Sequence, residues 1–214
     1  MKVLLINPPR FNEIIGNNPA IIEEERGYNP PLGILYVAAY LEEHSAHDVT
    51  VIDSQVEELS YNELGERISS AGPDVVGITA MTMTLIDVMK TVALVKGISK
   101  DIRVVLGGPH VHIFPDETIR LDGVDYLILG EGERVFKELL DRMDDGPRLR
   151  EVRGLVFKDG GGGGEGGEVV NTGTPPVVEE LDELPFPARH LVDYKKYGSL
   201  LSKGNVVTTV FTSR

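Results

Sequence analysis

Five short runs of Val, Ile and Leu recur along the first 130 residues, and they constrain the fold more than any other feature. The runs are KVLLIN (2–7), VTVID (49–53), DVVGIT (74–79), RVVLGG (103–108) and DYLILG (125–130). Runs this short and this rich in β-branched residues predict strands, and their nearly continuous apolar content indicates burial on both faces. Such burial requires helices above and below the sheet.

The segments between the runs supply those helices. Apolar residues recur in them at i, i+3 and i+4, and Pro31 stands near the start of the first segment. The predicted helices cover 31–44, 60–72, 84–99 and 133–143, with a shorter one at 115–123. Alternating strands and helices predict a parallel sheet with right-handed crossovers. We therefore expect an α/β protein with a doubly wound, flavodoxin-like (Rossmann-like) sheet of five parallel strands in the order 2-1-3-4-5.

The C-terminal third of the chain has a different pattern. Two strand-like stretches, REVRGLVFKDG and GEVVNTG, flank a glycine run at 160–167, and together they predict a β-hairpin with a flexible tip. The stretch ELDELPFPARHLVDYKKYG follows, and its prolines predict a connector of extended chain and short turns. We expect the five-stranded domain to cover 1–145, the hairpin and connector 146–204, and a further strand 205–214.

Charge and composition exclude several classes of protein. A chain of 214 residues that is 41% hydrophobic can bury a core, and its net charge of -13 argues against a nucleic-acid partner. No apolar run reaches the length of about 20 residues that spans a bilayer. The absence of cysteine excludes disulfides, thiolate metal sites and cysteine nucleophiles. We expect a cytoplasmic protein without a nucleic-acid or membrane partner.

The loops after the strands argue against phosphate-binding sites. The first loop reads NPPRFNEIIG, without the G-x-G-x-x-G of dinucleotide sites, and no Walker A sequence occurs. The positions that a phosphoacceptor receiver domain needs carry Asn7, Thr79 and Gly130 instead of its acidic residues and lysine. Proline lacks an N–H group, so Pro8 and Pro9 also make this a poor loop for the phosphate of FMN.

A pair of glycines at the end of the fourth strand indicates a ligand that needs room. In the predicted strand order, Gly107 and Gly108 lie beside the hydroxyl-rich loop TAMTMT (79–84). Glycine permits close approach of a ligand to the backbone, so the pair would open a slot along the sheet.

At these loops the chain resembles a known family. The loop pair is similar to the S-x-L and G-G elements of cobalamin-binding domains. Together with KVLLINPP (2–9), PPLGILYVAAYL (30–41), VVGIT (75–79), VVLGGPH (104–110) and LGEGE (129–133), it resembles the N-terminal, cobalamin (B12)-binding domain of cobalamin-dependent radical SAM enzymes, among them methyltransferases and oxidative cyclases of magnesium-protoporphyrin IX monomethyl ester. The resemblance covers essentially the whole chain.

The resemblance implies where the cofactor lies. The corrin ring would rest across the carboxyl edge of the sheet, and its nucleotide tail would enter a slot lined by Thr79, Met81, Gly107 and Gly108. The implied cobalamin-binding residues are Asn7, Pro8, Pro9, Arg10, Thr79, Ala80, Met81, Thr82, Thr84, Gly107, Gly108, Pro109 and His110, with Glu131 and Gly132 bordering the same groove.

The loop after the first strand departs from another group of cobalamin domains. Methionine-synthase-like domains carry D-x-H-x-x-G there, and its histidine ligates cobalt, whereas this loop has no Asp, His and Gly at that spacing. We therefore expect cobalamin bound with its base off the metal and without a histidine ligand. His110 and His112 lie near the site, and His110 is the weaker, alternative candidate for a cobalt ligand. We favour a histidine that caps the loop by hydrogen bonds or faces solvent.

The resemblance also implies what lies beyond this chain. In that family, the strand similar to NVVTTVFTSR (205–214) runs into a C-x3-C-x2-C motif that holds a [4Fe-4S] cluster, so we expect a fragment that stops before a radical SAM barrel. The fragment would bind cobalamin without catalysing, and the parent enzyme would use S-adenosylmethionine for methyl transfer or oxidative cyclisation. The alternative is a non-catalytic flavodoxin-like module that binds a nucleotide or a partner protein.

Overall fold

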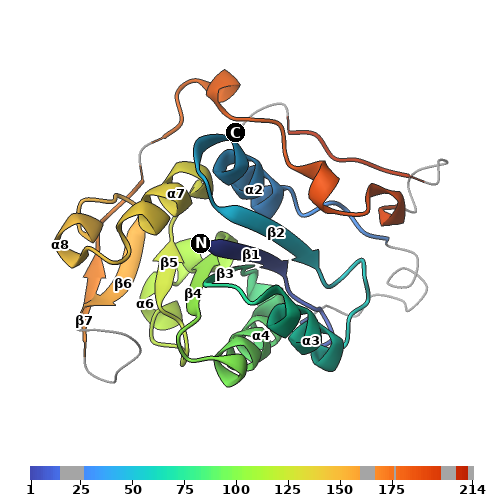
Figure 1. Ribbon diagram of the computed structural model, residues 1–214, viewed down its shortest axis with the longest axis horizontal. Coiled ribbons are helices and arrows are strands. Elements are labelled where there is room, and N and C mark those ends of the chain that lie inside the picture. Colours follow the sequence, from blue (N-terminus) through green and yellow to red (C-terminus); the bar gives the residue numbers. More distant parts are fainter. Residues whose placement is uncertain (15–26, 160–166, 176, 199–205, 212–214) are drawn as a thin grey trace.

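The structure is a computed structural model, and it describes residues 1–14, 27–159, 167–175, 177–198 and 206–211. One sheet of seven strands runs through it in the order β2-β1-β3-β4-β5-β6-β7 (Figure 1). The strands β1 to β5 are parallel and β6 and β7 are antiparallel to their neighbours. Their bounds are β1 Lys2–Asn7, β2 Asp48–Asp53, β3 Val75–Thr79, β4 Arg103–Gly107, β5 Tyr126–Ile128, β6 Leu155–Asp159 and β7 Glu168–Asn171.

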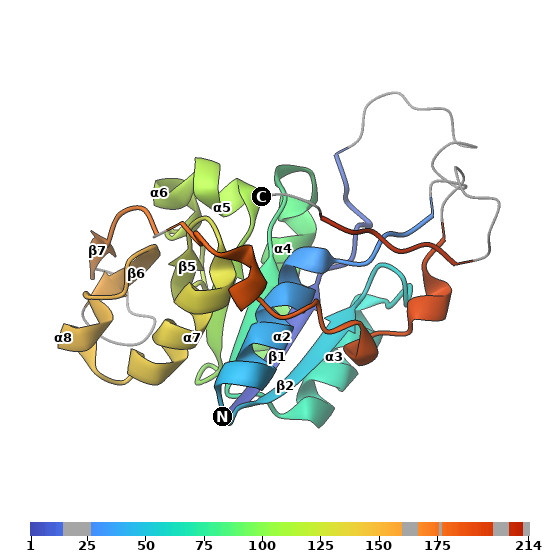
Figure 2. The same ribbon diagram turned by 90° about the horizontal axis from the view of Figure 1, so that it is seen from above.

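Helices cover both faces of this sheet, as the buried strands require. In Figures 1 and 2, α2 (Leu32–His44) and α7 (Gly132–Arg142) lie on one face, and α3 (Tyr61–Ala71) and α4 (Leu85–Ile98) lie on the other. Three short helices complete the set: α5 Pro109–Ile113, α6 Pro115–Thr118 and α8 Gly146–Leu149. Among the residues described, no helix has the length and apolar character to cross a bilayer.

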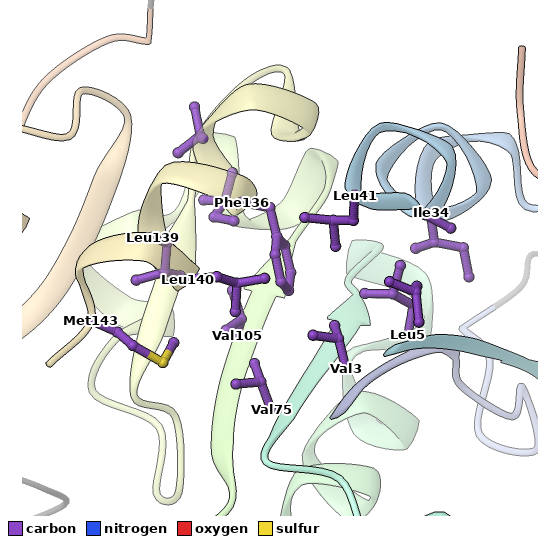
Figure 3. Close-up of a cluster of buried hydrophobic side chains, with 14 of the residues drawn as sticks. Val3, Leu5, Ile34, Leu41, Val75, Val105, Phe136, Leu139, Leu140 and Met143 are labelled. Atoms are coloured by element: carbon purple, nitrogen blue, oxygen red, sulfur yellow. The ribbon is translucent and has the colours of Figure 1, made fainter. Parts of the chain in front are cut away.

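Alternate strand residues build a separate core on each face of the sheet. Leu5 and Val105 pack with Phe136 of α7 in the first core, which Figure 3 shows in close-up. Leu4 and Val104, one position along, face α3 and α4 in the second core. The side chains on the two faces of the sheet therefore pack in separate cores, and a hollow in one core does not interrupt the packing of the other.

The predicted α/β fold is confirmed, including the order of the five parallel strands. The predicted hairpin is present as β6 and β7, but it extends the same sheet because β6 pairs antiparallel with β5. The helix expected at 115–123 is shorter, and α5 forms where a loop was expected. Residues 160–166 of the glycine run lie outside the described residues, and 206–211, within the last expected strand, have no sheet pairing in the described part of the chain.

The connector lies against α2 and β2. It forms three short 3-10 turns at Leu181–Glu183, Arg189–Leu191 and Tyr194–Lys196. Ala188 N donates to Leu35 O at 3.0 Å, and the side chain of Tyr197 is completely buried. The connector is therefore packed onto the first core.

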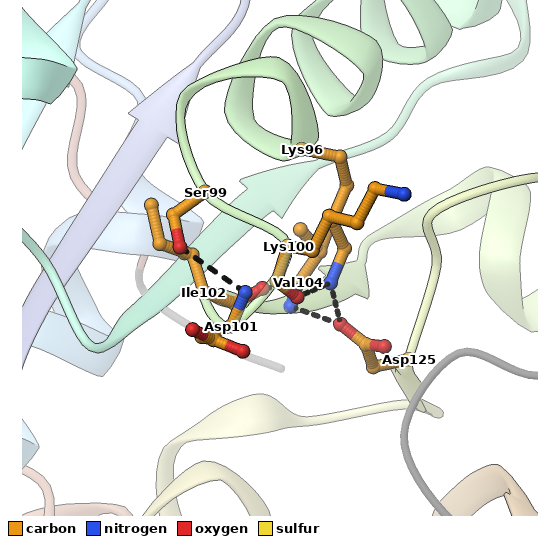
Figure 4. Close-up of polar contacts among 7 residues, drawn as sticks. All are labelled: Lys96, Ser99, Lys100, Asp101, Ile102, Val104 and Asp125. Carbon is orange, nitrogen blue, oxygen red and sulfur yellow. Dashed lines mark hydrogen bonds and ion pairs between the residues drawn. The ribbon is translucent and has the colours of Figure 1, made fainter.

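A largely buried ion pair closes the amino end of β4, opposite the site described below (Figure 4). Lys96 Nζ lies 2.6 Å from Asp125 Oδ2 and donates to Ile102 O at 2.7 Å. The same carboxylate oxygen accepts from Val104 N at 2.7 Å. The pair thus ties α4 to the starts of β4 and β5.

Candidate cobalamin site

The candidate site lies at the carboxyl edge of the sheet, between the sheet and helices α2 and α7. A narrow slot of about 140 Å³ opens there. Its lining is largely apolar and includes six glycines: Gly33, Gly77, Gly107, Gly108, Gly130 and Gly132. An apolar cavity of about 150 Å³ is large enough for benzene, so this slot is of the size that admits an aromatic ring.

The register of the strands explains how the slot forms. Leu5, Gly77 and Val105 stand side by side on β1, β3 and β4, and Thr79 and Gly107 form the next row toward the edge. Because position 77 has no side chain, Leu5 and Phe136 pack directly over the backbone of β3: a Cβ there would lie 2.7 Å from Leu5 Cδ2 and 2.9 Å from Phe136 Cε2. These two side chains close the inner end of the slot, and its open space lies beyond them toward Gly107.

The two adjacent glycines at the end of β4 have different roles. A Cβ at Gly107 would meet nothing closer than Ile128 O at 4.0 Å, so this position faces open space in the slot. A Cβ at Gly108 would lie 3.0 Å from Ala80 O, and Gly108 has φ +103°. Gly108 is needed for a tight turn, and Gly107 leaves the slot open.

A second hollow adjoins the slot at the carboxyl edge. It measures about 270 Å³ and shares Gly33, Ile34 and Thr79 with the slot. Asn7, Met81 and Thr84 line this hollow, so Met81 faces it and is not part of the slot. The two hollows together form a groove that runs from the surface of the edge to the interior of the first core.

The loops after β3 and β4 are joined by backbone hydrogen bonds. Ala80 N donates to Gly107 O at 2.7 Å, and His110 N donates to Ala80 O at 3.1 Å. Ala80 is buried, whereas Pro109 and Thr82 are exposed at the rim. The predicted residues of these two loops therefore lie together.

Of the predicted residues of the other two loops, Asn7 and Gly132 line the groove, whereas Pro8, Pro9, Arg10 and Glu131 are outside its lining. Pro8 and Pro9 are buried after β1, and the guanidinium of Arg10 lies 4.6 Å from the centre of the Tyr28 ring. Gly132 lines the slot at the first turn of α7, and Glu131 precedes it as the N-cap residue.

A buried hydrogen-bond network connects the groove to the connector. Asn7 Nδ2 donates to Asp53 Oδ1 at 2.7 Å, and the Tyr197 hydroxyl donates to Asp53 Oδ2 at 2.9 Å. Gln55 Nε2 donates to Asn7 Oδ1 at 3.3 Å. Burial raises the pKa of Asp53, and the hydrogen bonds from Asn7 and Tyr197 oppose that shift. Asp53 thus holds Asn7 in the lining of the second hollow, and Tyr197, 144 positions away in the sequence, holds Asp53.

Replacing Tyr197 with phenylalanine tests this network. The change removes one donor to a buried carboxylate, and hydrogen bonds to charged groups contribute about 1.5–3 kcal/mol. We expect Tyr197→Phe to lower the free energy of unfolding by about 2 kcal/mol in urea titrations. Tyr194→Phe, at a half-exposed position of the same connector, is the matched control and should change it by less than about 0.5 kcal/mol. Equal effects of the two variants would contradict the network.

His110 is held inside the loop pair. Its side chain is buried, its Nδ1 lies 3.1 Å from Thr82 Oγ1, and its ring lies 5.3 Å from that of Phe114. Burial lowers the pKa of His110. The imidazole of His110 is therefore engaged in contacts within the protein. Hydrogen bonding within the loop was one of the two roles that the sequence favoured over cobalt ligation.

The lowered pKa of His110 predicts a pH dependence of stability. At pH values between the lowered pKa of the folded state and the ordinary pKa of about 6.5, the unfolded chain binds more protons than the folded chain does. The contribution of the neutral, buried imidazole to the free energy of unfolding is therefore complete above about pH 6.5. It is lost as the pH falls toward the pKa of the folded state. Burial also lowers the pKa of His47, which adds a loss of the same sign.

We therefore expect the free energy of unfolding to fall less steeply below pH 6.5 in His110→Gln than in the parent chain. His112→Gln, at an exposed position of the same helix, should keep the parent slope. Urea titrations at several pH values measure the slopes, and an unchanged slope in His110→Gln would contradict this assignment.

Several residues of the slot were not among the predicted ones. They belong to its helix-side wall and its interior: Leu5, Gly33, Ile34, Val37, Gly77, Ile78, Val105, Ile128, Gly130 and Phe136. A glycine inside a strand marks a close approach, so Gly77 in VVGIT carried a usable signal. Gly33 in PPLG was a second such signal, because a glycine destabilises a helix and usually stands there for packing or for function.

Two other features of the described residues are separate from this groove. A hollow of about 580 Å³ lies at the amino ends of the strands, with Arg103 and Asp144 in its lining. Its lining includes none of the predicted site residues. Among the described residues, no three His, Asp or Glu side chains gather in a group that could hold a metal ion.

Comparison with known proteins identifies the class to which this fold and this groove belong. The model of the B12 binding domain family matches residues 19–140, more than half of the chain. The chain therefore belongs to the family of B12-binding domains. This confirms the resemblance drawn from the sequence.

Individual relatives narrow the class. The chain is 35% identical over 201 residues to an uncharacterized methyltransferase of Pyrococcus horikoshii, covering 92% of this chain and 40% of the relative. It is 30% identical over 204 residues to the anaerobic magnesium-protoporphyrin IX monomethyl ester cyclase of Rubrivivax gelatinosus, covering 92% of this chain and 34% of the relative. The chain thus spans two fifths or less of the length of these two relatives.

Solved structures show the same fold. The cobalamin-dependent S-adenosylmethionine radical enzyme OxsB with aqua-cobalamin bound matches with a TM-score of 0.68 at 20% identity, over 87% of this chain and 24% of OxsB. The radical S-adenosylmethionine methyltransferase TsrM from Kitasatospora setae matches with a TM-score of 0.60 at 19% identity, over 90% of this chain and 33% of TsrM. The chain thus shares its fold with the matched parts of both enzymes.

Proposed function

We propose that this chain binds cobalamin at the carboxyl edge of its sheet, with the nucleotide tail in the glycine-lined slot. The observation that carries the proposal is the open space of the glycine-lined slot at Gly107, where a Cβ would meet nothing closer than Ile128 O at 4.0 Å. Gly33 and Gly107 continue the slot to the edge, and a Cβ at Gly33 would meet nothing within 4 Å. The corrin ring would be held over the second hollow by Asn7, Thr79 and Met81.

We propose that cobalamin is bound with its base off the cobalt. A nucleotide base inside the slot is no longer available to the metal. The sequence of the loop after β1, residues 8–31, contains no histidine to replace it. His110 has its Nδ1 engaged with Thr82.

We base a proposal for the activity of the whole protein on its relatives. We infer a radical SAM enzyme with a [4Fe-4S] cluster and S-adenosylmethionine in a barrel outside this chain. The relatives include a methyltransferase and a cyclase that are more than twice as long, and the solved structures with the same fold are radical S-adenosylmethionine enzymes, one of them with a [4Fe-4S] cluster bound. Bound cobalamin would supply a carrier for a methyl group. The residues of this chain bind and orient the cofactor, and the chain alone binds without catalysing.

Titration of the chain with methylcobalamin, followed by the visible spectrum, tests the proposed function. We expect saturable binding with one cofactor per chain and a change to the base-off spectrum. FMN, titrated in parallel by fluorescence, should not bind, because the loop after β1 begins with two prolines, which lack N–H donors. Binding of FMN without binding of cobalamin would replace the proposal with the nucleotide-binding alternative.

A further inference from the structure

We propose that the slot selects cobalamin-like cofactors by their nucleotide base, accepting apolar aromatic bases such as dimethylbenzimidazole or p-cresol and disfavouring adenine. The inference rests on the proposed function, and it names the class of cofactor that the site takes. It follows from where the polar groups of the slot lie.

The interior of the slot is entirely apolar. Leu5 and Phe136 fill the space over Gly77 and, with Val105, form the inner wall of the slot; each of the three side chains is at least 95% buried. In Figure 3 these three side chains point toward one another from β1, β4 and α7. The strand backbones beneath them use their N–H and C=O groups in the sheet. No side chain there offers a hydrogen-bond donor or acceptor.

The polar side chain of the lining stands at the mouth of the slot. Thr79 is the residue in the lining that carries a polar side-chain atom, and it stands in the row nearest the edge. The first turns of α2 and α7 also reach the mouth through Gly33 and Gly132. A ligand with polar atoms at its entering end would leave them unpaired.

The bases of natural cobamides differ at that end. Each nitrogen base is tethered to its ribose through the five-membered ring, so the six-membered ring enters first. In dimethylbenzimidazole this ring carries two methyl groups, whereas in adenine it carries two acceptor nitrogens and an amino group. Burying such groups without partners is unfavourable. We expect the adenine-containing cofactor to bind at least about tenfold more weakly, which corresponds to one unpaired polar group.

Equilibrium binding of three cofactors to this chain tests the inference: cobalamin, the adenine analogue and the p-cresol analogue. The p-cresol group does not coordinate cobalt, so its analogue binds without first breaking a bond between base and metal. Comparison with this analogue therefore distinguishes the effect of the polarity of the base from the cost of detaching the base from cobalt. We expect the p-cresol analogue to bind at least as tightly as cobalamin and the adenine analogue to bind at least about tenfold more weakly than cobalamin.

A pair of variants locates the selectivity in the slot. Val105→Thr adds a hydroxyl to the apolar interior and should narrow the ratio between cobalamin and the adenine analogue. Val104→Thr makes the same change one position along, on the opposite face of β4 in the second core, and should leave the ratio unchanged. Both variants bury an added hydroxyl, so its cost to stability is common to them. A difference between their affinity ratios therefore shows that the polarity of the slot determines the selectivity.

Two results would overturn the inference, and they are distinguishable. Binding of the adenine analogue as tightly as cobalamin would overturn the selectivity and leave the proposed function standing. Absence of binding by all three cofactors would overturn the proposed function, and the inference with it.

Discussion

Replacing Gly107 with leucine is expected to lower the affinity of the chain for cobalamin at least about a hundredfold without unfolding it. The space at Gly107 faces the slot, so the new side chain would occupy the room that the nucleotide base needs. An aromatic group that buries about 150 Å² gains about 4 kcal/mol of hydrophobic free energy, and a hundredfold loss of affinity corresponds to about 2.7 kcal/mol of it.

The fold should tolerate this leucine because its Cβ meets no atom closer than 4.0 Å. Gly97→Leu is the matched control, since Gly97 is exposed on α4, on the other face of the sheet, and its Cβ would have no neighbour within 4 Å. We expect Gly97→Leu to bind cobalamin like the parent chain. Calorimetric titration measures the affinities, and circular dichroism checks the fold. Unchanged binding by a folded Gly107→Leu variant would exclude the slot as the site of the tail.

Replacing Lys96 with methionine is expected to lower the free energy of unfolding by about 3 kcal/mol. The change leaves the carboxylate of Asp125 without its cation, and Ile102 O loses a donor. Breaking one half of a buried ion pair costs about 3–5 kcal/mol, and the residual exposure of 18% for Lys96 and 12% for Asp125 places this pair near the lower limit.

Urea titrations measure this effect, and Lys100→Met is the matched control. Lys100 is exposed four residues further along, where loss of an ammonium group should change stability by less than about 0.5 kcal/mol. Lys96 is at the opposite end of β4 from the groove, so Lys96→Met should keep its cobalamin affinity at temperatures where it is folded. A loss of less than 1 kcal/mol would show that the pair contributes like an exposed one.

The five parallel strands and four long helices could be predicted because their patterns are local. Each strand of that set lies in a short apolar run, and the alternation with helices determines that neighbours are parallel. The attachment of the hairpin could not be predicted in the same way. The pairing of Leu127 on β5 with Val156 on β6 joins residues far apart in sequence, and nothing in either run specifies its partner.

The loops of the site could be predicted because the carboxyl ends of parallel strands meet at one edge. The helix-side wall of the slot depends on packing, and Phe136 and Val37 appear in the sequence as ordinary apolar residues of amphipathic helices. The different roles of Gly107 and Gly108 also required the structure. Two adjacent glycines look alike in a sequence, whereas the backbone places one toward open space and the other against Ala80.

The central claim is that the slot receives the nucleotide tail, and comparing cobalamin with cobinamide, which has the corrin ring but lacks that nucleotide, tests it most directly. We predict that this chain binds cobalamin at least about a hundredfold more tightly than cobinamide, and that Gly107→Leu removes the difference. Equal affinity of the parent chain for the two cofactors would contradict the account, because the tail would then contribute nothing and the slot would have another use.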